Sequence, residues 1–368
     1  MKILLLGDYS NVHATLAKGF RDLGHEVLVV SNGDFWKNYP RDIDLSRDLS
    51  WTGSIRFLFK VLRTLPRLRG FDVVQLINPM FMEMRAERLF PIYRYLKKHN
   101  KKVFLGAFGM DYYWVHECDT RKPLRYSDFN FGDELRHNKD AEKERRDWVG
   151  TAKERLNKMI ANDCDGIITG LYEYWACYHP IFPEKTTFIP YPIVPQQSSN
   201  HKEERERKPV RVFIGINRER SEYKGTYIML KAAEDVSKEY PGLMEIVKVE
   251  NVPFEQYEQL MNSSDAILDQ LYAYTPSMNA LLAMSKGIIN IGGGEPENYS
   301  ILNETELRPI INVLPTYQSV HDELVALITK PERIPELKRQ SQEYIIRHHD
   351  YLKVAKQYLD YYQSATTL

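Results

Sequence analysis

The sequence has few cysteines, no long apolar run and no excess of charge of either sign. Its 368 residues include only Cys118, Cys164 and Cys177, which show no paired spacing. A disulfide framework or a zinc cluster is therefore not readable, and a reducing compartment such as the cytosol is expected. No stretch reaches the roughly 18 apolar residues that a membrane-spanning helix needs. The run 1–7 begins like a signal peptide but is too short, so we expect a first strand there.

The charge of the chain is balanced. Its 50 basic and 50 acidic residues give a formal net charge of zero, so no global field that attracts nucleic acid or a membrane is expected. This balance does not exclude local patches of one charge. Hydrophobic residues make up 43% of the chain and charged residues 27%, which is typical of a globular protein. The length exceeds that of one ordinary core, so two domains are predicted.

Short apolar strand patterns alternate with longer helical patterns along the chain, which predicts parallel βαβ units. The expected strands are 2–6, 26–31, 72–77, 102–107, 166–169 and 186–189, then 210–216, 244–250, 266–270, 287–291 and 310–314. Residues 195–209 are rich in polar and charged residues, which is typical of a linker. The sequence therefore predicts an α/β protein with two Rossmann-like, doubly wound domains, 1–194 and 210–350, facing a central cleft.

The loops that follow strands are the expected binding loops, because ligands of open α/β sheets bind beyond the carboxyl ends of the strands. One of them contains Arg218 and Lys224, followed by Gly225 and a helical pattern. A helix N-terminus offers N–H groups and partial positive charge, to which arginine adds a planar fork and lysine a compact charge. Glycine lets a ligand come close to the backbone. A diphosphate site is predicted here; the alternative, which these residues leave open, is a solvated polar loop.

The chain resembles the GT-B glycosyltransferases, most closely glycosyltransferase family 4, over nearly its full length. The segments that carry the resemblance are, in chain order, 16–29, 72–74, 109–111, 164–169, 188–194, 218–225, 252–254, 265–269, 283–287 and 348–351. The resemblance implies that Arg218, Lys224 and Gly225 bind the donor diphosphate. It also implies that a C-terminal helix at about 351–368 rejoins the first domain.

Two carboxylates of the family are missing from this chain. The family has two glutamates eight residues apart, the second in Glu-Ala-Met-Ala-x-Gly, and alignment of 283–287 with this motif places Tyr274 and Leu282 at their positions. Phe108 likewise replaces the histidine of a His-Gly-x-Asp turn. Glu295 and Glu297, which follow three glycines, are candidates to bind sugar or ribose hydroxyls instead. The alternative is a flexible turn with solvated acids.

Other candidate site residues lie near expected helix starts. Ser277 and Asn279 are suited to present hydroxyl, amide and backbone N–H groups to the donor, with a plain N-cap as the alternative for Ser277. Asp111 is the candidate to orient an acceptor hydroxyl or to act as a base, with an N-cap as its alternative. Asn11 and His13, in the first loop, are candidates for acceptor or cleft contacts, although a lone histidine is more often structural.

The resemblance implies transfer of a sugar from a nucleotide-sugar donor to a saccharide or lipid-linked acceptor, in cell-surface polysaccharide synthesis. It implies retention of the anomeric configuration, no metal and no cofactor, because Arg218 and Lys224 would stabilise the departing diphosphate. Two alternatives stay open. One is a catalytically silent GT-B protein that binds a sugar nucleotide or a partner, and the other is a sugar-nucleotide epimerase.

Residues 51–69 mix apolar and basic side chains, the basic ones being Arg56, Lys60, Arg63, Arg67 and Arg69. Such a helix is suited to an anionic membrane, where a lipid-linked acceptor would be presented. The alternative is an ordinary surface helix packed on the first sheet. The expected location is therefore the cytoplasm, with contact at the inner face of the membrane as a hypothesis.

Overall fold

The computed structural model describes residues 1–48, 50–196, 209–216, 221–250, 252 and 254–365. The chain divides into two compact units. Unit 1 consists of Met1–Pro123, Lys143–Pro192 and Tyr351–Leu368, and unit 2 of Leu124–Glu142 and Ile193–Asp350. Arg218 and most of the predicted linker lie outside the described residues. Among the helices that the structure describes, none is both long and apolar enough to cross a bilayer.

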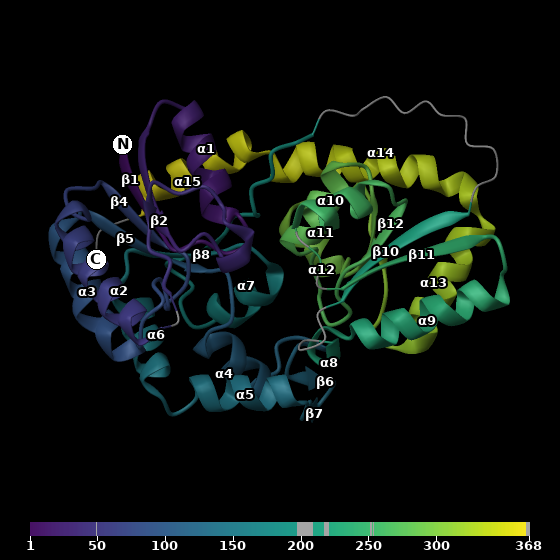
Figure 1. Ribbon diagram of the computed structural model, residues 1–368, viewed down its shortest axis with the longest axis horizontal. Helices are drawn as coiled ribbons and strands as arrows, with labels where there is room; N and C mark the ends of the chain where they lie inside the picture. Colours follow the sequence, from purple (N-terminus) through teal and green to yellow (C-terminus); the bar gives the residue numbers. More distant parts are fainter. Residues whose placement is uncertain (49, 197–208, 217–220, 251, 253, 366–368) are drawn as a thin grey trace. The chain divides into compact units, whose positions relative to one another are not determined.

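Unit 1 contains a seven-stranded parallel sheet in the order β3-β2-β1-β4-β5-β8-β9 (Figure 1). The strand order reverses between β1 and β4, which is where open α/β sheets place their ligands. The middle strands are apolar on both faces because helices cover both faces of a parallel sheet. The strands are β1 (Lys2–Leu6), β2 (Glu26–Ser31), β3 (Ile43–Asp44), β4 (Val73–Leu76), β5 (Lys102–Ala107), β8 (Gly166–Thr169) and β9 (Thr186–Phe188).

The last helix of the chain belongs to unit 1 and packs on its first helix (Figure 1). Gly19 makes this contact close, since a Cβ atom there would lie 2.8 Å from the Cβ atom of Ala355. The Tyr351 hydroxyl donates to Asp22 at 2.8 Å across the same contact. The helices are α1 (Val12–Asp22), α2 (Trp51–Thr64), α3 (Ala86–His99), α4 (Tyr112–Thr120), α5 (Lys139–Trp148, beginning in unit 2), α6 (Ala152–Asp163), α7 (Tyr172–Tyr178) and α15 (Tyr351–Ser364).

Unit 2 contains a five-stranded parallel sheet in the order β11-β10-β12-β13-β14, with its reversal between β10 and β12. Val212 and Ile214 pack against α9 and α13, while Phe213, which points to the other face, packs near α10 and α11. The strands are β10 (Val210–Ile216), β11 (Met244–Glu250), β12 (Ala266–Leu268), β13 (Ile289–Gly292) and β14 (Ile311–Asn312). The helices are α8 (Ser221–Lys224), α9 (Thr226–Glu239), α10 (Phe254–Asn262), α11 (Met278–Ser285), α12 (Pro296–Ile301), α13 (Tyr317–Thr329) and α14 (Ile334–Tyr344), followed by a π-helical turn at Ile345–His349.

One segment of unit 2 comes from the first half of the chain. This segment, Leu124–Glu142, is called the strap below and contains the short antiparallel pair β6 (Asn130–Phe131) and β7 (Glu134–Leu135). The buried Asn130 amide closes its loop by donating to the carbonyl oxygens of Leu124 and Gly132 at 2.9 and 3.0 Å. The sequence predicts these residues within the first domain, 1–194, because nothing local marks them as a separate segment.

Candidate functional site

The turn that follows β10 is joined to the turn that follows β12. The carbonyl oxygen of Lys224, at the end of α8, accepts from the backbone N–H of Leu271 at 3.0 Å. Gly225 then starts α9 with a φ of 71°, and a Cβ atom there would lie 2.8 Å from the Cβ atom of Leu271. Only glycine meets both conditions without strain. Lys224 and Gly225 therefore lie at the strand-order reversal of unit 2, where a ligand is expected.

Three polar side chains are held together beside this turn. The Ser277 hydroxyl donates to Asp269 at 2.6 Å. The Asn279 amide donates to the Tyr257 hydroxyl at 2.9 Å and to Asp269 at 3.4 Å. Ser277 occupies the N-cap position of α11, but its side chain does not cap the helix. The serine is therefore not the plain N-cap considered as its alternative; it is tied to a carboxylate at the end of β12.

Helices α9 and α11 thus begin without a side-chain cap, the first at a glycine and the second at a serine that is turned toward Asp269. Uncapped helix N-termini keep partial positive charge and backbone N–H donors at the surface of the site. Both helices follow strands at the reversal point of the same sheet. This arrangement favours an anionic ligand in unit 2.

Glu295 and Glu297, the candidates for sugar or ribose contacts, are bonded to the strap. Arg125 donates to Glu295 at 2.7 Å and to Glu297 at 2.6 Å, and the Tyr126 hydroxyl donates to Glu295 at 2.5 Å. Asn312 adds a third bond to Glu295 at 3.1 Å. Glu295 is 4% exposed, so its carboxylate is enclosed by these partners.

Tyr274, the residue that the resemblance aligns with the first of two glutamates, belongs to the same network. Its hydroxyl accepts from the backbone N–H of Arg125 at 2.7 Å, and the Arg125 guanidinium lies 4.9 Å from its ring centroid. The ring is also 4.8 Å from that of Tyr126. Leu282, which the resemblance aligns with the second glutamate, packs against the apolar cluster around Phe213. Tyr274 therefore helps to hold the strap, and Leu282 packs in the core of unit 2.

A second arginine fixes the other end of the strap beside the Lys224 turn. Arg136 donates to the carbonyl oxygens of Glu222 and Tyr223 at 2.8 and 3.3 Å. Its guanidinium lies 3.3 Å from the ring centroid of Tyr272. The two strap arginines therefore bind two segments that carry candidate donor residues, Arg125 the one with Glu295 and Arg136 the one before Lys224.

In unit 1, a buried carboxylate caps the first helix, α1. Asp8 accepts from the backbone N–H groups of His13 and Ala14 at 3.0 and 3.1 Å, and this carboxylate closes the start of α1. Asn11 has a left-handed φ of 69°, and its carbonyl oxygen accepts from Thr15 at 3.0 Å. Burial raises the pKa of Asp8 to about 7 against the effect of these bonds.

His13 is completely buried at the start of α1. Its Nδ1 lies 2.7 Å from the carbonyl oxygen of Gly7 and must donate to it. Burial lowers the pKa of His13 to about 3, so the ring is neutral and Nε2 carries a lone pair. Among the described residues, no protein group bonds Nε2. The ring therefore presents one acceptor atom near the reversal point of the first sheet.

Asp111 caps α4. Its carboxylate accepts from the backbone N–H of Trp114 at 2.9 Å and from the Tyr178 hydroxyl at 2.7 Å, and the residue is 0% exposed. Burial raises its pKa to about 7, although these bonds oppose the rise. The structure places Asp111 where its alternative interpretation did, at a helix N-cap.

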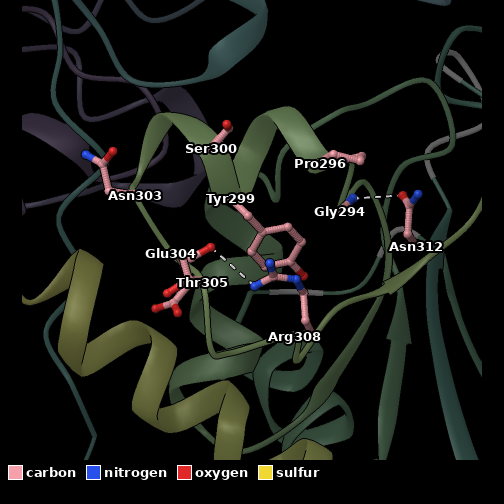
Figure 2. Close-up of a pocket in the computed structure, with 9 residues that line it drawn as sticks. All are labelled: Gly294, Pro296, Tyr299, Ser300, Asn303, Glu304, Thr305, Arg308 and Asn312. Atoms are coloured by element: carbon pink, nitrogen blue, oxygen red, sulfur yellow. Dashed lines mark hydrogen bonds between the residues drawn. The ribbon is translucent and has the colours of Figure 1, made fainter.

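Unit 2 also carries a pocket of 640 Å³ that is lined by α12, the segment that follows it and Asn312 of β14 (Figure 2). Arg308 lies 4.3 Å from the ring centroid of Tyr299 in this pocket. The carboxylate of Glu304 accepts from Arg347 and His348 at 3.2 and 2.6 Å. The Glu304 carboxylate is paired with protein side chains and Arg308 stacks on Tyr299, so we do not assign the donor to this pocket.

The strap residues Arg125, Tyr126 and Arg136 and the anchor residue Asp269 were missed from the sequence. Arg125 lies 170 residues from Glu295, and no local pattern connects them. Asp269 was marked only as part of a family-like segment. Its position directly after a buried strand at a reversal point was the signal that could have identified it.

The fold matches solved glycosyltransferase structures, whereas no protein-family model and no curated sequence matches the chain. Sucrose-phosphate synthase from Thermosynechococcus elongatus is similar with a TM-score of 0.63 at 12% identity, covering 99% of this chain and 98% of that one. Anabaena HepE, solved with UDP and glucose, gives 0.60 at 11% identity, covering 99% and 100%. TarM from S. aureus gives 0.55 at 11%, covering 84% and 59%. This chain has the GT-B fold, with two Rossmann-like domains.

Proposed function

We propose that this protein is a glycosyltransferase of the family 4 type, which moves a sugar from a nucleotide-sugar donor to a saccharide or lipid-linked acceptor. The observation that carries the proposal is the position of Lys224 and Gly225 at the strand-order reversal of unit 2, within a GT-B fold. HepE, which is similar over its full length, was solved with UDP and glucose. A uridine nucleotide is therefore the first donor to test.

The donor diphosphate would bind at Lys224, the N-terminus of α9 and Arg218. Gly225 gives this helix no side-chain cap, so its first N–H groups and its dipole remain directed at an anion. Charge that develops on the diphosphate as the glycosidic bond breaks would be stabilised there without a metal. The Asp269, Ser277 and Asn279 group supplies hydroxyl, carboxylate and amide groups for the nucleotide or the sugar.

The sugar would be held without the two family glutamates. Glu295 and Glu297 bind Arg125, which leaves them the role of positioning the strap and α12. On the acceptor side we favour His13 over Asp111, because Nε2 of the buried neutral ring is an acceptor that no described group uses. It would accept a hydrogen bond from an acceptor hydroxyl, while Asp111 positions α4 as its cap.

Calorimetric titration of the protein with UDP, ADP and GDP tests the diphosphate site. We expect Lys224→Ala and Arg218→Ala each to weaken nucleoside diphosphate binding by about 1.5–3 kcal/mol, the range for charge-assisted hydrogen bonds. Lys238→Ala is the matched control, because this exposed lysine lies at the far end of α9. Unchanged affinity for nucleoside diphosphates in both site variants would show that the diphosphate does not bind at these residues.

Turnover is tested with the same donors as nucleotide sugars, measured by release of the nucleoside diphosphate with and without saccharide or polyprenyl-phosphate acceptors. The stereochemistry of the product would test the proposed retention. Binding without turnover across all donors and acceptors would identify a catalytically silent sugar-nucleotide-binding protein. Conversion of the sugar without transfer would identify an epimerase. Activity on a polyprenyl-linked acceptor would support a role in cell-surface polysaccharide synthesis at the cytoplasmic face of the membrane.

A further inference from the structure

Helix α2 of unit 1 exposes an apolar stripe. Ile55, Leu58, Phe59 and Leu62 are 44%, 37%, 69% and 53% exposed. At about 100° per residue these four side chains fall within an arc of about 100° on one side of the helix. A stripe of this width normally faces a core, yet here it faces away from the protein.

The opposite side of the same helix already packs on unit 1. Phe57 and Val61 are 6% and 2% exposed, and Leu68, after the helix, is 0% exposed. The Ser50 hydroxyl caps the helix by accepting from Gly53 at 3.0 Å, so its start is fixed as well. Helix α2 is therefore apolar on two sides, and only one side is used within the chain.

The charged residues of α2 itself are all basic. The segment 51–69 contains five basic residues and no acidic residue. Lys60 bonds Asp44 at 3.2 Å, and Asp48 is close enough to Arg56 for that charge to lower its pKa. Arg63, Arg67 and Arg69 are exposed, and no ion pair with a described residue is found for them. By helical periodicity, Arg56 and Arg63 flank the apolar stripe on one side.

We propose that α2 docks unit 1 on an anionic lipid surface, with the stripe in the acyl–headgroup boundary and the arginines on lipid phosphates. Long arginine side chains reach headgroups while apolar neighbours insert. A second copy of the chain is a poorer occupant, because two segments without acidic residues would repel each other. A stripe of four residues is also far smaller than the roughly 20–30 residues a side of a stable protein interface. The inference does not rest on transferase activity.

Flotation of the full chain with phosphatidylcholine vesicles, with and without phosphatidylglycerol, tests this proposal in the absence of nucleotide. We expect binding to the anionic vesicles alone, weakened by salt because surface charges are screened. Phe59→Asp with Leu62→Asp should abolish it. Arg63→Gln with Arg67→Gln should weaken it about 25-fold, about fivefold for each charge.

Matched control variants test whether vesicle binding depends on α2. Leu314→Asp changes another half-exposed leucine, in unit 2, and Lys330→Gln with Arg333→Gln removes two exposed charges there. We expect both controls to float like the wild-type chain, and thermal unfolding of every variant to match the wild type. Absence of flotation, equal loss in the controls, or equal binding to neutral vesicles would overturn the proposal. So would a lipid-free dimer, detected by light scattering, that the Phe59 and Leu62 changes dissociate.

Discussion

Two helices of unit 1 and two helices of unit 2 that follow strands begin in different ways. In unit 1, Asp8 and Asp111 place carboxylates on the starts of α1 and α4. In unit 2, α9 starts at Gly225 and α11 at a serine whose hydroxyl bonds Asp269. A carboxylate at a helix start satisfies its N–H groups and repels a second anion, whereas an uncapped start attracts one. The starts of α1 and α4 are therefore closed by carboxylates, whereas α9 and α11 start without a side-chain cap.

This difference gives a physical reason for assigning the donor to unit 2. A nucleotide diphosphate needs donors and positive charge, and the proposed donor site has Lys224 and two uncapped helix starts. A neutral acceptor hydroxyl needs one acceptor atom, and the proposed one is the buried Nε2 of His13. The proposed division of the two roles between the units therefore rests on charge and capping.

Of the substitutions that test this contrast, we expect the largest effect at Asp111. We expect Asp111→Ala to lower the free energy of unfolding of unit 1 by about 2–4 kcal/mol, because it removes a cap and leaves the buried Tyr178 hydroxyl without its acceptor. Ser277→Ala, the matched change at an N-cap position of unit 2, should lower stability by less than about 1 kcal/mol. The five tryptophans (Trp36, Trp51, Trp114, Trp148 and Trp175) all lie in unit 1. Urea unfolding followed by tryptophan fluorescence therefore reports the Asp111 variant, and circular dichroism reports Ser277→Ala. Equal losses would contradict the division into capped and uncapped starts.

The strap allows a second comparison, between Glu295 and Glu297, the two carboxylates that bind Arg125. Glu295→Ala should destabilise unit 2 by about 2 kcal/mol, because Arg125, Tyr126 and Asn312 lose a buried acceptor. Glu297→Ala should cost under 1 kcal/mol, since its side chain is 26% exposed. Hydrogen exchange of the strap amides measures both. Faster exchange with Glu297→Ala than with Glu295→Ala would show that the enclosed carboxylate does not hold the strap.

The buried acids of unit 1 predict an unusual pH dependence. The pKa of Asp111 is raised to about 7 from an ordinary value near 4, so the folded protein binds one more proton there between about pH 5 and 7. Stability from this group is present at low pH and is lost as the pH rises toward 7, by at most about 1.4 kcal/mol per pH unit. Asp8 acts in the same direction and His13, whose pKa is lowered, in the opposite one.

Asp111→Asn isolates this effect, because the amide oxygen can still cap α4. We expect the unfolding free energy of the wild-type chain to fall more steeply between pH 5 and 7 than that of the variant. Tryptophan fluorescence in urea at each pH gives both curves. Parallel curves would mean that Asp111 is ionised throughout this range.

Much of the fold was predictable because each element carries its own periodic pattern. Strands β1, β2, β5, β8, β10 and β11 were predicted with the bounds that the structure gives. The two-residue strand β3 and the short helices α8 and α12 were missed, since elements this short do not complete a pattern. Predicted strands 72–77, 266–270 and 310–314 extended past the paired residues of β4, β12 and β14.

The candidate site was less predictable, because its residues act through partners distant in the chain. Lys224, Gly225, Ser277 and Asn279 were found as residues after strands, which local pattern can show. The engagement of Glu295 by Arg125 could not be found, because a flexible acidic turn and a buried ion pair have the same local sequence. Arg218, the predicted partner of Lys224, lies outside the described residues.

The amino-acid sequence by itself determined the alternation of strands and helices, the glycine at the start of α9 and the basic, apolar character of α2. These properties depend on the residue types at short separations, which every copy of the chain carries unfolded or folded. Only the tertiary structure decided which carboxylates close a helix, which glutamates hold the strap and which side of α2 stays exposed. Burial and partner choice depend on residues brought together from distant parts of the chain, and they turn the same side chain into a cap, an anchor or a ligand.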